Sequence, residues 1–191
     1  MILRHIRKEK CIQKRLIMSV FRIKFKPQDE VYFVDGNRLC KSKVRTVSSS
    51  LSHKDGEEAT HYGVIYHSET KRGLTLPESQ LFRSPDELFR QSFGFNKDNV
   101  EPDDDKFLEY DVDYRTLERV YFINNNSISE GLITNVTIEL GDTSNVNNRI
   151  KILLTLKTED GETSVPAESV RRQKQDLLEF LKQNIFDCTN L

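Results

Sequence analysis

Tryptophan is absent from the sequence, and cysteine and methionine are scarce. The three cysteines, Cys11, Cys40 and Cys188, lie far apart, and no Cys-x-x-Cys pair occurs. This spacing suggests neither a disulfide framework nor a zinc site. No stretch approaches the roughly 20 apolar residues of a membrane span, and the N-terminus has no apolar run of signal-peptide length. We therefore expect a cytoplasmic protein with reduced thiols that neither crosses a membrane nor is secreted.

Motifs that carry catalysis are also missing. The sequence contains neither of the two common glycine-rich phosphate loops. The four histidines have no partner at metal-ligand spacing, and the serine run at 48–50 lacks the strand–turn–helix setting of a nucleophile. Acid–base catalysis needs two carboxyl groups held in one pocket with separated proton affinities, and no such pair stands out. We therefore expect no enzyme, no metal site and no cofactor.

Apolar residues are fewer than in an average globular domain, because 36% of the 191 residues are hydrophobic and 31% are charged. This composition favours two small cores over one large core. Charge is also distributed unevenly. Residues 1–26 contain nine basic residues and one acidic residue, which leaves a net charge of −9 for the remaining chain within a total of −1.

We assign residues 1–25 to a basic N-terminal arm. Such an arm is either a solvated extension or a segment that binds nucleic acid or a membrane surface, and the sequence leaves both interpretations open. Clear repeat patterning begins after Met18, so we expect translation to begin at that residue.

The most informative feature is an internal repeat with an offset of 89 residues. Val-Tyr-Phe-Val-Asp-Gly-Asn at 31–37 corresponds to Val-Tyr-Phe-Ile-Asn-Asn-Asn at 120–126. The same offset relates apolar residues throughout the two segments: Leu39 and Ile128, Val44 and Ile133, Val47 and Val136, Leu81 and Val170, Leu88 and Leu177. A constant offset at both ends of a long segment indicates two diverged copies of one unit.

Each copy has the pattern of several short strands followed by one helix. The first strand, at 31–34 or 120–123, is rich in β-branched and aromatic residues. Residues 35–37 and 124–126 suit tight hairpin turns, because Gly, Asn and Asp tolerate left-handed backbone conformations. Three further strands are predicted in each copy from alternating or continuous apolar residues.

A helix is predicted at the end of each copy. Ser84, Pro85 and Glu87 form a capping box with proline at the first helical position. The second helix is predicted at 174–184, where the leucines have helical spacing.

We therefore predict a mainly β fold with two similar small barrels or curled antiparallel sheets, each closed by a short C-terminal helix. The first copy spans residues 26–95 and the second spans residues 116–186. Residues 96–115 form an acidic linker, since eight acidic residues and two lysines lie between positions 97 and 113. We expect each copy to fold separately when the chain is cut within residues 98–104.

In strand number, strand length and turn placement, each copy resembles the Tudor-like group of small β-barrels. The resemblance covers both copies and includes no diagnostic motif of a named family. It implies a recognition module and assigns no binding residues to this chain.

We therefore expect a non-catalytic binding or adaptor protein with two related recognition surfaces and a protein or peptide partner. The alternative is a nucleic-acid-associated protein that uses the basic arm and the aromatic residues of the barrels. The Lys41, Lys43 and Arg45 stripe fits either function, and it also fits a solvated strand face. The candidate binding residues are Tyr32, Asn37, Lys41, Lys43, Arg45, Tyr121 and Asn126.

Overall fold

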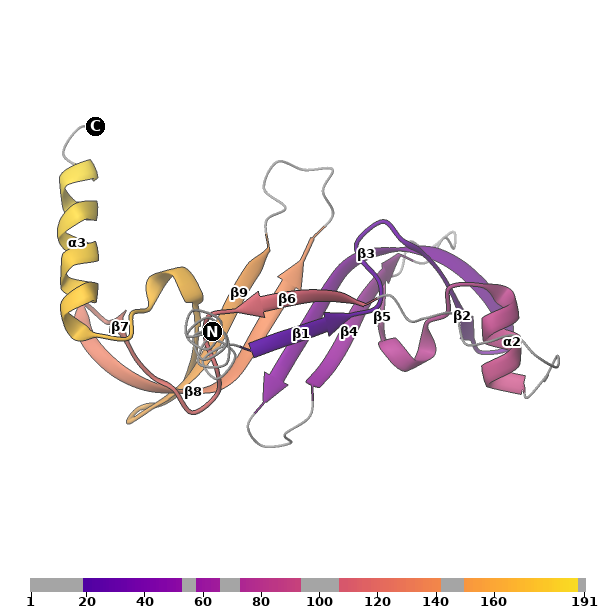
Figure 1. The fold of residues 1–191 in the computed structure, drawn as a ribbon, viewed down its shortest axis with the longest axis horizontal. Coiled ribbons are helices and arrows are strands. Elements are labelled where there is room, and N and C mark those ends of the chain that lie inside the picture. The colour runs from indigo at the N-terminus through magenta and orange to yellow at the C-terminus, as the bar shows by residue number, and fades with distance from the viewer. Residues whose placement is uncertain (1–18, 53–57, 66–72, 94–106, 142–149, 189–191) are drawn as a thin grey trace, which may run out of the picture.

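The computed structural model describes residues 19–52, 58–65, 73–93, 107–141 and 150–188, and Figure 1 shows their arrangement. The mainly β fold is confirmed, because antiparallel strands form a curled sheet and two short helices lie at its opposite ends. Within this part of the chain, neither helix combines the length and the apolar character that crossing a membrane requires.

The two copies contain the same elements in the same order. The first copy consists of β1 (Ser19–Ile23), β2 (Glu30–Asp35), β3 (Arg38–Ser52), β4 (Glu58–Ile65), β5 (Gly73–Pro77), the 3₁₀ turn η1 (Glu78–Gln80) and α2 (Pro85–Phe93). The second copy consists of β6 (Leu108–Val112), β7 (Arg119–Asn124), β8 (Ser127–Leu140), β9 (Lys151–Thr158), β10 (Gly161–Pro166), η2 (Ala167–Ser169) and α3 (Lys174–Cys188).

The repeat extends to individual backbone hydrogen bonds. Tyr32 and Phe82 exchange two N–H···O bonds of 2.9 Å, and at the same offset Tyr121 and Arg171 exchange bonds of 2.7 and 2.9 Å. These bonds connect the segment after each 3₁₀ turn to the first strand of each hairpin, β2 or β7. Both copies therefore use the same backbone connection to curl the sheet.

Strands from both copies form one continuous sheet, in the order β10-β9-β8-β3-β4-β5, with β2 also paired to β3 and β7 to β8. Strands β3 and β8 pair antiparallel over Val47 to Ser52 and Asn135 to Leu140. A second antiparallel pair, β1 with β6, forms a ribbon that crosses the middle of the molecule (Figure 1).

The two copies are related by an approximate two-fold axis. In the β1–β6 ribbon Phe21 lies opposite Tyr110, and in the β3–β8 junction Ser49 lies opposite Ile138. Phe21 and Ser49 each lie opposite their own equivalent in the other copy, because the two residue numbers in each pair differ by the repeat offset of 89. Antiparallel pairing of equivalent residues is the arrangement found across the two-fold axis of a symmetric dimer.

One hydrophobic core runs through both copies. Phe21 and Ile23 of β1 pack in the same cluster as Val47 of β3 and Val136 and Ile138 of β8. The ribbon therefore covers the inner face of the sheet across the junction. The core also contains Phe33 and Phe122, which the alternating pattern of the opening strands places on the inner face.

The sheet and ribbon differ from the sequence-based organisation in two respects. Strand β1 lies within the segment 1–25 that was assigned to the basic arm, and β6 lies within the segment 96–115 that was assigned to the linker. The two copies also share a sheet, whereas the sequence predicts a separate core for each. Both differences come from strand pairing between the copies, which involves residues about 90 positions apart.

The capping box at the start of α2 is present. The Ser84 Oγ atom accepts the Glu87 backbone N–H at 3.1 Å, and Pro85 is the first helical residue. The Glu87 carboxylate accepts the backbone N–H of Arg83 at 2.6 Å, one residue before the cap. The Ser84 bond satisfies one of the backbone donors that a helix start leaves unpaired, and the Glu87 bond fixes the residue that leads into the helix.

Candidate binding surface

Four of the candidate residues lie on the outer face of the β2–β3 ribbon. Antiparallel register places Tyr32 opposite Lys41 and Glu30 opposite Lys43, while the alternate residues Val31 and Phe33 are buried. Arg45 follows on the same strand and is exposed at a β-bulge between Val44 and Thr46. The structure therefore brings the predicted stripe of one tyrosine and three cations together on one face, and the role of this stripe in binding stays a prediction.

The charges of this face form a local network. The Lys41 Nζ atom lies 2.9 Å from Glu30 Oε2 and 5.7 Å from the centre of the Tyr32 ring. The hydrogen bond to the Glu30 carboxylate raises the pKa of Lys41 above its ordinary value. One carboxylate stands among three cations, so the outer face of the first copy has a net positive charge.

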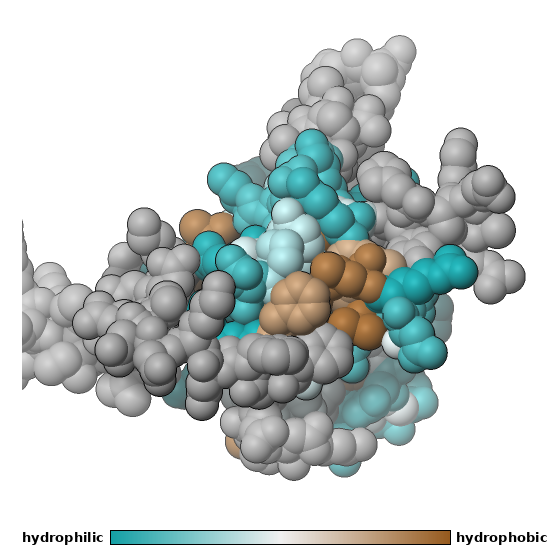
Figure 2. Space-filling model, turned by 90° about the vertical axis from the view of Figure 1, so that its right-hand side faces the viewer, coloured by the Kyte–Doolittle hydropathy of each residue, from teal (hydrophilic) through white to brown (hydrophobic). Residues whose placement is uncertain are grey.

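The end of this ribbon is apolar. Val34 lies opposite Leu39, and their side chains are 41% and 47% exposed. Phe89 of α2, at the same end of the molecule, is 42% exposed. Figure 2 shows that hydrophobic surface gathers in one patch at this end, beside hydrophilic surface.

The second copy keeps the apolar end of the ribbon and loses its positive charge. Ile123 lies opposite Ile128, at the positions equivalent to Val34 and Leu39, and Ile123 is 41% exposed. An ion pair of 2.9 Å joins Arg119 and Glu130, at the positions of Glu30 and Lys41 but with the charges exchanged. The positions of Lys43 and Arg45 are occupied by Leu132 and Thr134, which carry no charge.

The candidate residues Asn37, Tyr121 and Asn126 do not join the basic stripe. Asn37 and Asn126 lie in the exposed hairpin turns, and Asn126 has a φ of 63°, which asparagine tolerates better than most residues. The conformation of the turn therefore explains Asn126 without a ligand. Tyr121 lies on the second copy opposite Glu130, at the other end of the molecule from Tyr32.

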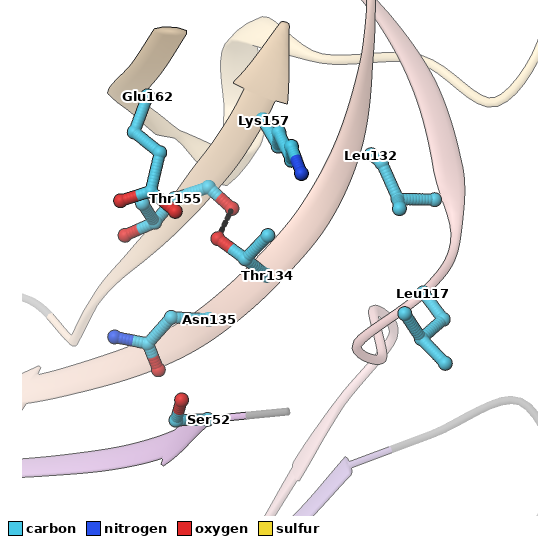
Figure 3. Close-up of a pocket in the computed structure, with 8 residues that line it drawn as sticks. All are labelled: Ser52, Leu117, Leu132, Thr134, Asn135, Thr155, Lys157 and Glu162. Carbon is cyan, nitrogen blue, oxygen red and sulfur yellow. Dashed lines mark hydrogen bonds between the residues drawn. The ribbon is translucent and has the colours of Figure 1, made fainter. Parts of the chain in front are cut away.

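A hollow of about 570 Å³ is lined by residues of the second copy and by Ser52 at the end of β3, and Figure 3 shows its lining. The Thr134 hydroxyl donates to the Thr155 carbonyl at 3.3 Å, and the Asn135 Nδ2 atom is 3.4 Å from the Thr137 hydroxyl. Within the described residues, the buried Asn135 Oδ1 atom has no hydrogen-bond partner. The lining consists of Ser52, Leu117, Leu132, Thr134, Asn135, Thr155, Lys157 and Glu162. None of the candidate residues borders this hollow, whose volume suits a small molecule.

Sequence reasoning missed a pair of equivalent arginines that fix the segment before each helix. Arg83 donates to the Lys24 carbonyl at 3.1 Å and lies 5.5 Å from the centre of the Phe25 ring. Arg172 likewise donates to the Asp113 carbonyl and lies 5.1 Å from the Tyr114 ring, and it also pairs with Glu118. Their shared offset of 89 is the signal that identifies them as a conserved part of the repeat unit.

Among the residues that the structure describes, no group of three or more histidine, cysteine or acidic side chains is arranged to hold a metal ion. Comparison with known proteins gives no assignment either. No protein-family model matches the chain, and searches of curated proteins and of solved structures found no match. The proposals below therefore rest on the geometry of this molecule.

Proposed function

We propose that the chain is a non-catalytic binding protein whose two copies are Tudor-like barrel units with related recognition surfaces on the outer faces of β2–β3 and β7–β8. The observation that carries this proposal is the aliphatic pair at the end of each ribbon: Val34 and Leu39 are both exposed, and at the equivalent positions Ile123 is exposed and Ile128 half-buried. Exposed apolar side chains that recur at equivalent positions are typical of a surface that contacts a protein or peptide.

A pull-down from native extract with the full chain, with and without nuclease, tests this proposal. The expected result is a set of partners that survives nuclease and is reduced when Val34 and Leu39 are both replaced by serine. Replacement of the equally exposed Ile150 by serine is the matched control, because it removes apolar surface away from the ribbons. Loss of every partner on nuclease treatment contradicts the proposal.

Nucleic-acid binding is the second candidate, and the contact between Lys41 and Tyr32 favours it. Tyr32 is half-buried, and a cation beside a partly accessible aromatic ring is a combination with which small barrels bind single strands, because the ring stacks on a base while the cation neutralises a phosphate. A salt titration with a random-sequence duplex and a single strand tests this candidate, using the full chain and a version that begins at Met18. Micromolar binding with a steep salt dependence would place this function first, since each phosphate contact adds about 0.9 to the slope on duplex DNA. A slope that the truncation abolishes would assign the phosphate contacts to residues 1–17, and a slope that survives it would assign them to the rest of the chain.

A further inference from the structure

Resting on the proposed function, we propose that the β2–β3 face binds a partner-protein segment in which acidic residues stand next to aliphatic ones, and that the β7–β8 face does not bind it. The two faces share one fold and one ribbon geometry. Their differences therefore identify which chemical features of the first face select a partner.

Charge is the feature that separates the two faces. The Glu30–Lys41 pair has a counterpart in Arg119–Glu130, so it contributes no net charge in either copy. Lys43 and Arg45, replaced by leucine and threonine in the second copy, give the first face its net charge of two. A partner that complements this surplus carries negative charge, and complementary charges at an interface direct both encounter and specificity.

The spacing of the groups suits an extended segment. Lys41 and Lys43 project from the same side of β3 because they are two residues apart, which corresponds to about 7 Å along a strand. Leu39 precedes them by the same interval and lies opposite Val34. An extended partner with alternate side chains facing this surface can place one aliphatic residue at the apolar end and acidic residues along the cations.

The same face is less suited to a nucleic acid. Tyr32 is one ring on this face, and its neighbours Val34 and Leu39 are aliphatic and provide no further ring on which a second base can stack. Glu30 lies among the cations, where its carboxylate repels a phosphate backbone. An acidic peptide can avoid Glu30 by placing an aliphatic or polar residue beside it.

The internal repeat supplies an experiment in which each copy is the control for the other. In the first variant, E30R, K41E, K43L and R45T give the first face the side chains of the second. In the reciprocal variant, R119E, E130K, L132K and T134R give the second face the side chains of the first. In both variants the ion pair of the ribbon is kept and its two charges change places. Circular dichroism and urea unfolding verify that each variant is folded.

The probe is a random 12-residue peptide library selected on the immobilised full chain, followed by affinity and stoichiometry measurements in solution. The expected peptides are net negative with at least one aliphatic residue, and they bind the wild-type chain at one site. The first variant is expected to lose about ten-fold or more in affinity, because several rim charge pairs are lost together. The reciprocal variant is expected to bind two peptides per chain.

Enriched peptides that bind the first variant as tightly as the wild-type chain overturn this inference and leave the proposed binding function standing. Enrichment of neutral or basic peptides has the same consequence. If no peptide is enriched and the pull-down yields no nuclease-resistant partner, both proposals fail together. A single-stranded oligonucleotide that binds the wild-type chain and loses affinity for the first variant, with no peptide enriched, assigns the face to nucleic acid and contradicts the inference.

Discussion

Phe33 and Phe122 occupy equivalent positions in the centre of the opening strands, and their side chains are 0% and 2% exposed. Replacing either residue with alanine removes a buried ring and leaves a cavity that the neighbours fill incompletely. We expect each change to lower the free energy of unfolding by about 3–5 kcal/mol. Urea unfolding measures this loss. Val34→Ala, on the outer face of the same strand, is the control, and equal losses at Val34 and Phe33 would show that the strand faces are assigned the wrong way round.

Tyr114 provides a prediction that depends on pH. Burial raises its pKa above the ordinary value of 10.0, and the hydroxyl group lies 3.3 Å from the carbonyl oxygens of Ala167 and Val170. The folded state therefore keeps the proton at a pH where the unfolded state releases it. Stability attributable to this group is present below pH 10 and decreases as the pH rises above it.

Tyr114→Phe tests this coupling and reproduces the first copy, which has Phe25 at the equivalent position. The variant is expected to lose about 1 kcal/mol at neutral pH through the missing hydrogen bond. As the pH rises above 10 its stability is expected to fall less steeply than that of the wild-type chain. Parallel stability curves for the two proteins over that range would show that Tyr114 ionises equally in both states.

The sequence predicted single residues well where the cause is local and poorly where it is not. Alternation within one strand puts Phe33 and Tyr32 on opposite faces, because successive side chains in a strand point to opposite sides, and in the structure Phe33 is buried and Tyr32 half-buried. The role of Arg83 depends on the carbonyl of Lys24, which lies 59 positions earlier in the chain. Periodicity cannot reveal such a contact, although the equivalent arginine at position 172 provides a hint.

At the scale of elements, the two helices differ in how they begin. The backbone carbonyls of Ser84 and the equivalent Gln173 accept the N–H groups of Leu88 and Leu177 at 3.1 and 3.3 Å, and Ser84 also caps α2 through its side chain. Ser84→Ala is therefore expected to destabilise the chain by about 0.5–2 kcal/mol. Gln173→Ala is the matched control and is expected to have almost no effect in the same urea titration. Similar losses for both variants would contradict a capping role that is specific to Ser84.

Strand prediction from the sequence succeeded for the hairpins and failed for β1 and β6. Strand β1 alternates buried and exposed residues, with Phe21 and Ile23 inward, and β6 alternates only from Glu109 onward, where it ends on the buried Val112. Their exposed side chains include Arg22 in β1 and Glu109 and Asp111 in β6, and the surrounding basic and acidic runs gave the two strands the composition of an arm and a linker. Each strand pairs with the other copy, so no neighbouring segment in the sequence marks it as part of a hairpin.

Strand β4 of the first copy and the equivalent β9 of the second show that the repeat tolerates local changes of length. Val44 lies opposite Val64 in the first copy, and Ile133 lies opposite Leu156 in the second, so the offset is 92 for this strand. The offset returns to 89 at β5 and β10, where Leu76 and Val165 occupy equivalent register positions. The loops on either side of the strand absorb the difference, because surface connections tolerate insertions better than paired strands do.

At the scale of the whole molecule, the approximate two-fold axis relates the two ends as it would in a symmetric dimer. The repeat could be found in the sequence, because equivalent residues keep their chemical character. The joining of the two copies into one sheet could not be found in the sequence, because the pairing of β3 with β8 depends on the register that puts Ser49 opposite Ile138. Ser49 is buried without belonging to the apolar set, so hydrophobic patterning gives it no special place.

The shared sheet also changes the expectation for a divided chain. Antiparallel pairing in two places and a core that includes both copies bury surface that each copy would expose alone. Strand edges that are paired in the whole molecule would become open, and open edges associate with other strands. We therefore expect the two copies to remain together after the chain is cut, whereas the sequence predicted two independent units.

The central claim is that the two copies form one body through β1–β6 and β3–β8, and one measurement tests it most directly. A protease site placed within residues 98–104 is cleaved under native conditions, and the mass in solution is measured by light scattering after size exclusion. We predict a single species with the mass of the intact chain, which separates into two fragments only in denaturant. Two folded species of about half that mass under native conditions would contradict the shared sheet and restore the interpretation of two independent barrels.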